Sequence, residues 1–115
     1  MMSTETLLAG LRRELLDFED VQDSILARYD YHPTAFDNGE LHNAAGQNEG
    51  SCRLLAFALL NSLDEQDTLL CFGRHYRRVL ATPEGSDHGN IRNFMRHGWS
   101  GVRFHGQALT AKPGH

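Results

Sequence analysis

The sequence predicts a single α+β domain in which helices dominate, and three observations support this fold class. The chain has 115 residues, a length that suits one domain with its own hydrophobic core. Apolar residues recur at helical spacing over most of this length. Only two short extended segments, residues 31–36 and 101–106, interrupt the helical pattern. We therefore expect about five helices and a small two-stranded antiparallel ribbon in one domain over residues 1–115.

The first third of the chain contains two predicted helices and a turn. Apolar residues recur at helical spacing over residues 7–15 and again over residues 18–29. Acidic residues crowd the start of the second helix, where they meet the positive end of the helix dipole. Pro33 disfavours helix just before it, and Asn38 followed by Gly39 is a strong turn signal.

The middle of the chain is predicted as a loop followed by two helices. Residues 41–51 have little to bury, whereas residues 52–60 are apolar nearly all round and indicate a central buried helix. Ser62 and Glu65 form an S-x-x-E capping box for the next helix, which we expect to run to about Ala81. Gly73 lies inside that helix, and a glycine there indicates a close helix contact.

The last third of the chain is predicted as a short helix followed by a strand. Asp87 is a suitable N-cap for this helix, and Gly98 is a suitable residue to end it. Apolar and polar residues alternate over 101–106, as in a strand with one buried face. We expect residues 102–104 to pair with residues 34–36, because no other extended partner is available.

Composition and charge exclude several classes of protein. The net charge is −4, which argues against nucleic acid as the main partner. The longest apolar run, residues 54–60, is too short to insert across a membrane, and no Sec-type signal peptide opens the sequence. Cys52 and Cys71 are too few for a disulfide scaffold and fit a reducing compartment.

Charge is distributed unevenly between the two parts of the chain. Residues 1–67 carry a net charge of −9, and residues 68–115 carry a net charge of +5, almost all of it from arginine. Either the acidic part packs on the basic part within one domain, or the basic part presents an anion-binding face.

Two polar segments are the candidate functional site. The loop over residues 42–52 and the segment over residues 87–92 each lead into a predicted helix. Helix N-termini have free N–H groups and a positive dipole end, both of which attract anions. We therefore expect these segments to lie side by side and form a pocket for a small polar or anionic ligand. The candidate binding residues are His42, Asn43, Gln47, Asn48, Glu49, Ser51, Cys52, Asp87, His88, Asn90 and Arg92.

Three alternatives to a ligand pocket stay open. The amides of the loop can instead hold the loop in place by satisfying buried backbone groups. Cys52 in the first turn of a helix, with His88 as a base, suits a small enzyme with a thiolate nucleophile. His42, Glu49 and His88 offer ligands for a metal ion, although no metal-binding motif is present. These residues assign no reaction, no catalytic residue and no cofactor.

Several motifs resemble those of the HopJ type III effector family. The most specific is HNAAGQNEGSC at 42–52, and the others are YDY at 29–31, PTAF at 33–36, NG at 38–39, FGR at 72–74, YR at 76–77, DH at 87–88, NIRNFM at 90–95 and GW at 98–99. The resemblance covers residues 7–109. It implies a small bacterial protein that stays in the bacterial cytoplasm or is secreted into a host cell, where a host or bacterial protein is its partner. The family name supplies no biochemical activity.

Overall fold

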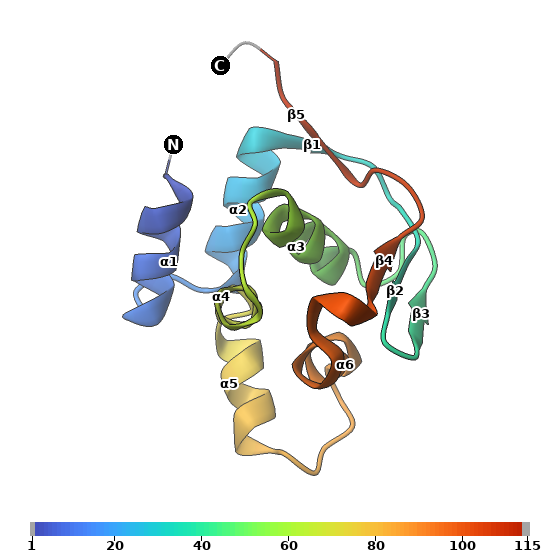
Figure 1. Ribbon diagram of the computed structural model, residues 1–115. Coiled ribbons are helices and arrows are strands. Elements are labelled where there is room, and N and C mark those ends of the chain that lie inside the picture. Colours follow the sequence, from blue (N-terminus) through green and yellow to red (C-terminus); the bar gives the residue numbers. More distant parts are fainter. Residues whose placement is uncertain (1, 114–115) are drawn as a thin grey trace.

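A computed structural model describes residues 2–113 and confirms an α+β fold that is mainly helical (Figure 1). Within these residues there are six α-helices, one 3-10 helix and five short strands. In chain order the elements are α1 (Thr4–Arg12), α2 (Phe18–Arg28), β1 (Tyr29–Tyr31), β2 (Phe36–Asn38), β3 (Leu41–Asn43), α3 (Glu49–Leu60), α4 (Glu65–Leu70), α5 (Arg74–Ala81), α6 (Gly89–His97), η1 (Gly98–Gly101), β4 (Val102–Phe104) and β5 (Leu109–Ala111).

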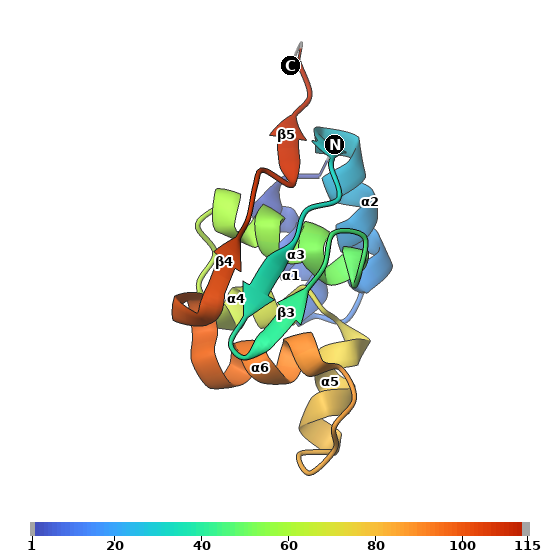
Figure 2. The same ribbon diagram turned by 90° about the vertical axis from the view of Figure 1, so that its right-hand side faces the viewer.

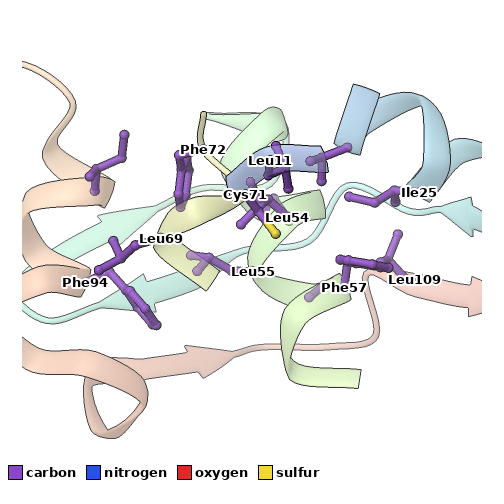
Figure 3. Close-up of a cluster of buried hydrophobic side chains, with 14 of the residues drawn as sticks. Leu11, Ile25, Leu54, Leu55, Phe57, Leu69, Cys71, Phe72, Phe94 and Leu109 are labelled. Carbon is purple, nitrogen blue, oxygen red and sulfur yellow. The ribbon is translucent and has the colours of Figure 1, made fainter. Parts of the chain in front are cut away.

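Helix α3 lies at the centre of the hydrophobic core, between the other helices and the strands (Figure 1). Its side chains Leu54, Leu55 and Phe57 are fully buried, as the apolar run predicts. Figure 3 shows Phe57 beside Ile25 of α2 and Leu109 of β5. Full burial of each such side chain stabilises the fold by about 2 kcal/mol, so α3 contributes much of the driving force for folding.

A three-stranded antiparallel sheet packs beside the helices, in the order β3-β2-β4 (Figure 2). The predicted pairing is confirmed in part, because β4 pairs with residues 36–38 and not with residues 34–36. Within the predicted segment only Phe36 is paired, and it lies opposite Phe104. The prediction of a loop beginning at residue 41 is wrong, because β3 forms a hairpin with β2 through the turn at Gly39 (φ +61°). Buried Asn43 anchors the end of this hairpin, so a polar residue has a structural role there.

A second ribbon, which the sequence did not predict, pairs β1 with β5. Tyr29 lies opposite Ala111, and Tyr31 lies opposite Leu109. Leu109 and Ala108 enter the core, so this ribbon brings the end of the described chain back against α3.

The helix predicted to run through Gly73 is two helices, α4 and α5, because Gly73 has φ +59° and ψ −129°. Few residues other than glycine adopt this conformation. A Cβ atom on Gly73 would overlap the carboxylate of Asp17, so the predicted close helix contact is confirmed. The break explains why about five expected helices become six.

The predicted N-cap of α4 is wrong. The Asp64 side chain accepts a hydrogen bond from Asp67 N at 2.8 Å and caps the helix instead of Ser62. Ser62 has φ +55° and ends α3, since its N–H donates to Leu59 O while Leu63 N donates to Ala58 O. This pair of bonds is a Schellman motif, so Ser62 belongs to the end of one helix and not to the start of the next.

The predicted N-cap of α6 is also wrong. His88, with φ +52°, is the N-cap residue, and its side chain makes no capping bond. Asp87 instead accepts a hydrogen bond from Arg92 at 2.7 Å. Because the guanidinium of Arg92 binds the Asp87 carboxylate, that side chain is not directed at the first N–H groups of α6.

Candidate functional site

A pocket of about 470 Å³ lies between the N-terminal ends of α3 and α6. The start of α2 and the junction of α4 with α5 complete its walls. Its lining residues are Phe18, Leu41, Asn48, Gly50, Ser51, Phe72, His75, His88, Gly89, Asn90 and Ile91. The volume lies in the range that holds small organic molecules in proteins.

A buried network of three asparagines holds the two predicted segments side by side. Asn90 Nδ2 donates to Asn43 Oδ1 at 2.9 Å, and Asn43 Nδ2 donates to Asn90 Oδ1 at 3.2 Å. Asn38 Nδ2 donates to the backbone oxygen of Asn90 at 2.8 Å. All three side chains are buried, so the network fixes the β2–β3 hairpin against the start of α6.

Four of the predicted binding residues line the pocket: Asn48, Ser51, His88 and Asn90. Asn43 lies directly behind them, where its Oδ1 also accepts a hydrogen bond from Asn48 Nδ2 at 2.7 Å. The amides of Asn43 and Asn48 therefore hold the loop in place, as one of the alternatives proposed.

The other six predicted residues lie outside the lining. Gln47 accepts a hydrogen bond from Ala44 N at 3.0 Å and closes a turn within the loop. Glu49 is the first residue of α3 and does not reach the pocket. Asp87 and Arg92 bind each other, and Arg92 also donates to Thr82 O at 2.8 Å, so this pair braces the loop between α5 and α6.

Cys52 is buried and does not have the reactive thiol that its place near a helix start suggested. Only 1% of the residue is exposed, and its Sγ donates to Thr34 O at 3.4 Å. Burial raises the pKa of the Cys52 thiol, and the backbone contact with Thr34 only partly opposes that effect. At neutral pH the thiol stays protonated, which argues against a thiolate nucleophile.

His42 lies on the outer face of the sheet, away from Glu49 and His88. Its Nδ1 is 2.6 Å from Asp37 Oδ1. Within residues 2–113, the one group of three metal-ligating side chains that lie close together is Asp37, His42 and His105. The predicted metal trio of His42, Glu49 and His88 is therefore not assembled.

Two unpartnered helix starts give the pocket its positive character. Asn48 before α3 and His88 before α6 both have left-handed backbone conformations, and neither side chain caps its helix. In contrast, Ser3, Asp17 and Asp64 cap α1, α2 and α4 with their side chains. The first N–H groups of α3 and α6 therefore border the pocket without a side-chain acceptor of this kind.

Four pocket residues outside the two predicted segments were missed by the sequence analysis: His75, Phe18, Phe72 and Leu41. The rings of His75 and His88 are 5.3 Å apart, and Phe18 meets His75 edge to face at 5.1 Å. Burial is the main cause that lowers the pKa of His75, and the charges of Arg74 and His88 lower it further. The helix break at Gly73, which places His75 here, was the missing signal.

Comparisons with known proteins show the family of this chain. The model of the HopJ type III effector protein family matches residues 4–109, so the chain belongs to this family. The chain is also similar to VPA0580, whose crystal structure is described as that of a protein of unknown function, with 49% identity and a TM-score of 0.89. That match covers 96% of this chain and 95% of VPA0580. A search of curated proteins found no match.

The family name links its members to type III secretion. Within residues 2–113, no helix combines the length and the apolar character that crossing a membrane requires.

Proposed function

We propose that this protein is a small binding protein that holds an anionic organic ligand in the pocket between α3 and α6. The observation that carries the proposal is the pocket itself, about 470 Å³ in volume and bordered by two helix N-termini and two histidines. The protein would then act by contact and not by turnover, in agreement with the buried, protonated thiol of Cys52.

The charge of the lining supports an anion as ligand. None of the lining residues that the structure describes is acidic, although the whole chain has a net charge of −4. Asp87 Oδ2 lies 3.8 Å from His88 Nε2, but the stronger contact of this carboxylate is the hydrogen bond that its Oδ1 accepts from Arg92 at 2.7 Å. A carboxylate or phosphate placed at the two helix starts would accept hydrogen bonds from backbone N–H groups and from the Ser51 hydroxyl.

The apolar part of the lining supports an organic ligand over an inorganic ion. Phe18 and Phe72 stack with their ring centroids 6.3 Å apart, and Leu41 and Ile91 also line the pocket. A flat apolar group fits against these side chains while its anionic group faces the helix starts. Aromatic carboxylates and aromatic phosphates are the chemical class that combines these features.

Family membership supports a proposal about where the protein meets its ligand. We propose that the protein meets its ligand in the bacterial cytoplasm or, after type III secretion, in a host cell, where a host or bacterial protein is its partner.

Titration with phenyl phosphate and benzoate, followed by NMR chemical shifts of the backbone amides, tests the proposal. We expect shifts at Ser51, His88 and Gly89, and a loss of affinity of at least tenfold in His88→Ala. His97→Ala at the other end of α6 is the matched control and should bind as the unchanged protein does. Binding should strengthen as the pH falls through the pKa of His75, which burial lowers from its ordinary value, because a protonated imidazole attracts the anion.

Two results would contradict the proposal. One is the absence of shifts at these amides with millimolar probe. The other is equal affinity of His88→Ala and the unchanged protein.

A further inference from the structure

The outer face of the three-stranded sheet carries a second cluster of functional side chains. Asp37 lies at the middle of β2 and faces His42 of β3 in the strand register. On its other side Asp37 faces Arg103 of β4. His105 follows β4 and lies on the same face as Arg103, since alternate residues of an extended chain point to the same side. Three adjacent chain segments therefore bring one carboxylate and two imidazoles together.

The distances in this cluster suit a metal ion. His42 Nδ1 is 2.6 Å from Asp37 Oδ1, and His105 Nε2 is 2.8 Å from Asp37 Oδ2. One ligand atom from each residue lies within 4.8 Å of the other two. In a tetrahedral Zn²⁺ site with bonds of about 2.0–2.2 Å, the ligand atoms lie roughly 3.3 Å apart. Small side-chain rotations therefore suffice to place the three donors around one ion.

We propose that Asp37, His42 and His105 bind one divalent transition-metal ion, for which Zn²⁺ is the best chemical match. Two imidazole nitrogens and one carboxylate oxygen form a ligand set that Zn²⁺ uses in sites with an open position. The side chains of His42, His105 and Asp37 are 62%, 44% and 33% exposed. The ion would keep at least one position open to solvent or to a partner's side chain. This proposal is independent of the ligand pocket.

The opposite face of the sheet holds the three ligands in place. Phe36, Asn38 and Asn43 flank Asp37 and His42 in the strands, and each is fully buried. The Asn38 and Asn43 side chains both bind Asn90, so the hairpin cannot slide without breaking buried hydrogen bonds. A site whose backbone is fixed in this way loses little conformational freedom when an ion binds.

The hydrogen bonds of the cluster converge on one carboxylate. His42 and His105 each direct a ring nitrogen at Asp37. A divalent cation would take the place of the protons that the imidazoles now direct at this carboxylate.

Substitution of Arg103 tests whether the ion bound at this cluster is positively charged. It faces Asp37 across the strands, and among the described residues it makes no ion pair with a carboxylate within 4.0 Å. Its charge opposes a cation, so Arg103→Gln should bind Zn²⁺ about threefold more tightly at moderate salt. Weaker Zn²⁺ binding by Arg103→Gln would overturn the proposal, because loss of a positive charge beside a bound cation removes repulsion and cannot weaken its binding at this cluster.

The main experiment measures Zn²⁺ binding by the full chain, prepared without a histidine tag, in competition with a chromogenic chelator. We expect one ion per chain and a micromolar Kd at a pH of about 7.5. Asp37→Asn, His42→Gln and His105→Gln should each weaken binding at least tenfold. His97→Gln is the matched control, because His97 Nε2 pairs with the single carboxylate of Glu40 at 2.9 Å, and this variant should bind as the unchanged protein does.

Two further measurements distinguish a specific site from surface adsorption. Zn²⁺ should shift the ring-nitrogen NMR signals of His42 Nδ1 and His105 Nε2, and circular dichroism should show that all variants keep the fold. The proposal is overturned if no stoichiometric binding occurs, if the three ligand variants bind Zn²⁺ as tightly as the unchanged protein, or if the shifted rings belong to other histidines.

Discussion

Two junctions in this protein begin helices in opposite ways. At the first, the Asp17 carboxylate starts both α2 and α5, because its Oδ1 accepts hydrogen bonds from Phe18 N at 2.7 Å and from Arg74 N at 2.9 Å. At the second, α3 and α6 begin after the left-handed residues Asn48 and His88, and no side chain caps either helix. The comparison shows that a carboxylate at helix starts closes one junction, whereas its absence leaves a pocket at the other.

Gly73→Ala should break the first junction with the largest effect. The new methyl group would overlap the Asp17 carboxylate and lie 2.8 Å from Phe18 N, at a backbone conformation with φ +59°. We expect a loss of about 3 kcal/mol or more in the free energy of unfolding, measured by chemical denaturation. Gly46→Ala is the matched control, because its φ is +88° but nothing lies within 4 Å, and it should cost only about 1 kcal/mol.

A Gly73→Ala variant as stable as Gly46→Ala would show that α2 and α5 do not depend on this close contact.

Asp17→Asn should weaken the same junction by about 2 kcal/mol at neutral pH, since it removes a charged acceptor shared by two helix starts. Burial alone would raise the pKa of Asp17, but the N–H groups of Arg74 and Phe18 and the charges of Arg74 and Arg77 lower it overall. A carboxyl with a lowered folded-state pKa stabilises the fold above its unfolded pKa of about 3.9 and stops doing so as the pH falls through its folded value.

The difference between Asp17→Asn and the unchanged protein should therefore shrink below a pH of about 4, which denaturation at two pH values measures. Glu19→Gln is the control, because its carboxylate is 59% exposed in the pair with Arg74 and should contribute less to stability than Asp17 does. An Asp17→Asn effect that does not vary with pH would contradict the role of the charge.

His88→Gly, at the second junction, should have the smallest effect on stability. It distinguishes a role of His88 in ligand binding from a role in the fold. Glycine relieves the left-handed backbone at φ +52° but raises the entropy of the unfolded chain, so we expect a melting temperature within a few degrees of the original. Binding of phenyl phosphate should nevertheless fall, because the imidazole is lost from the pocket. A large fall in melting temperature would show that His88 serves the fold and not a ligand.

Local patterns predicted the helical core well, because a helix buries residues that repeat within a few positions of each other. The central helix around Leu55 and the pairing of Phe36 with Phe104 follow from periodicity and alternation. Caps were predicted less well, since an S-x-x-E pattern at Ser62 does not reveal which of two adjoining helices the serine serves.

The candidate site depended on contacts between distant segments, which local patterns do not encode. The contact of Asn43 with Asn90 agrees with the expected meeting of two polar segments, whereas His75 joins the pocket only because the chain turns at Gly73. The contact between Asp37 and His42 could have been predicted from the sequence, because a two-residue turn at Gly39 places these residues opposite each other. The place of His105 in this cluster could not be predicted in the same way, because it depends on where β4 lies in the sheet.

Both sheets pair strands that are far apart in the sequence, and this separation affects how the protein folds during synthesis. β1 and β2 come early in the sequence, but their partners β5 and β4 come at its end. Closing such long loops for strands of three residues costs chain entropy before it yields contacts, so the sheets form late in folding. During synthesis on the ribosome, Phe36 and the side of α3 that Leu109 covers stay open to water until the last strands emerge. A chain without β4 and β5 would therefore expose apolar surface and unpaired strand edges, the features that make folding intermediates prone to aggregate.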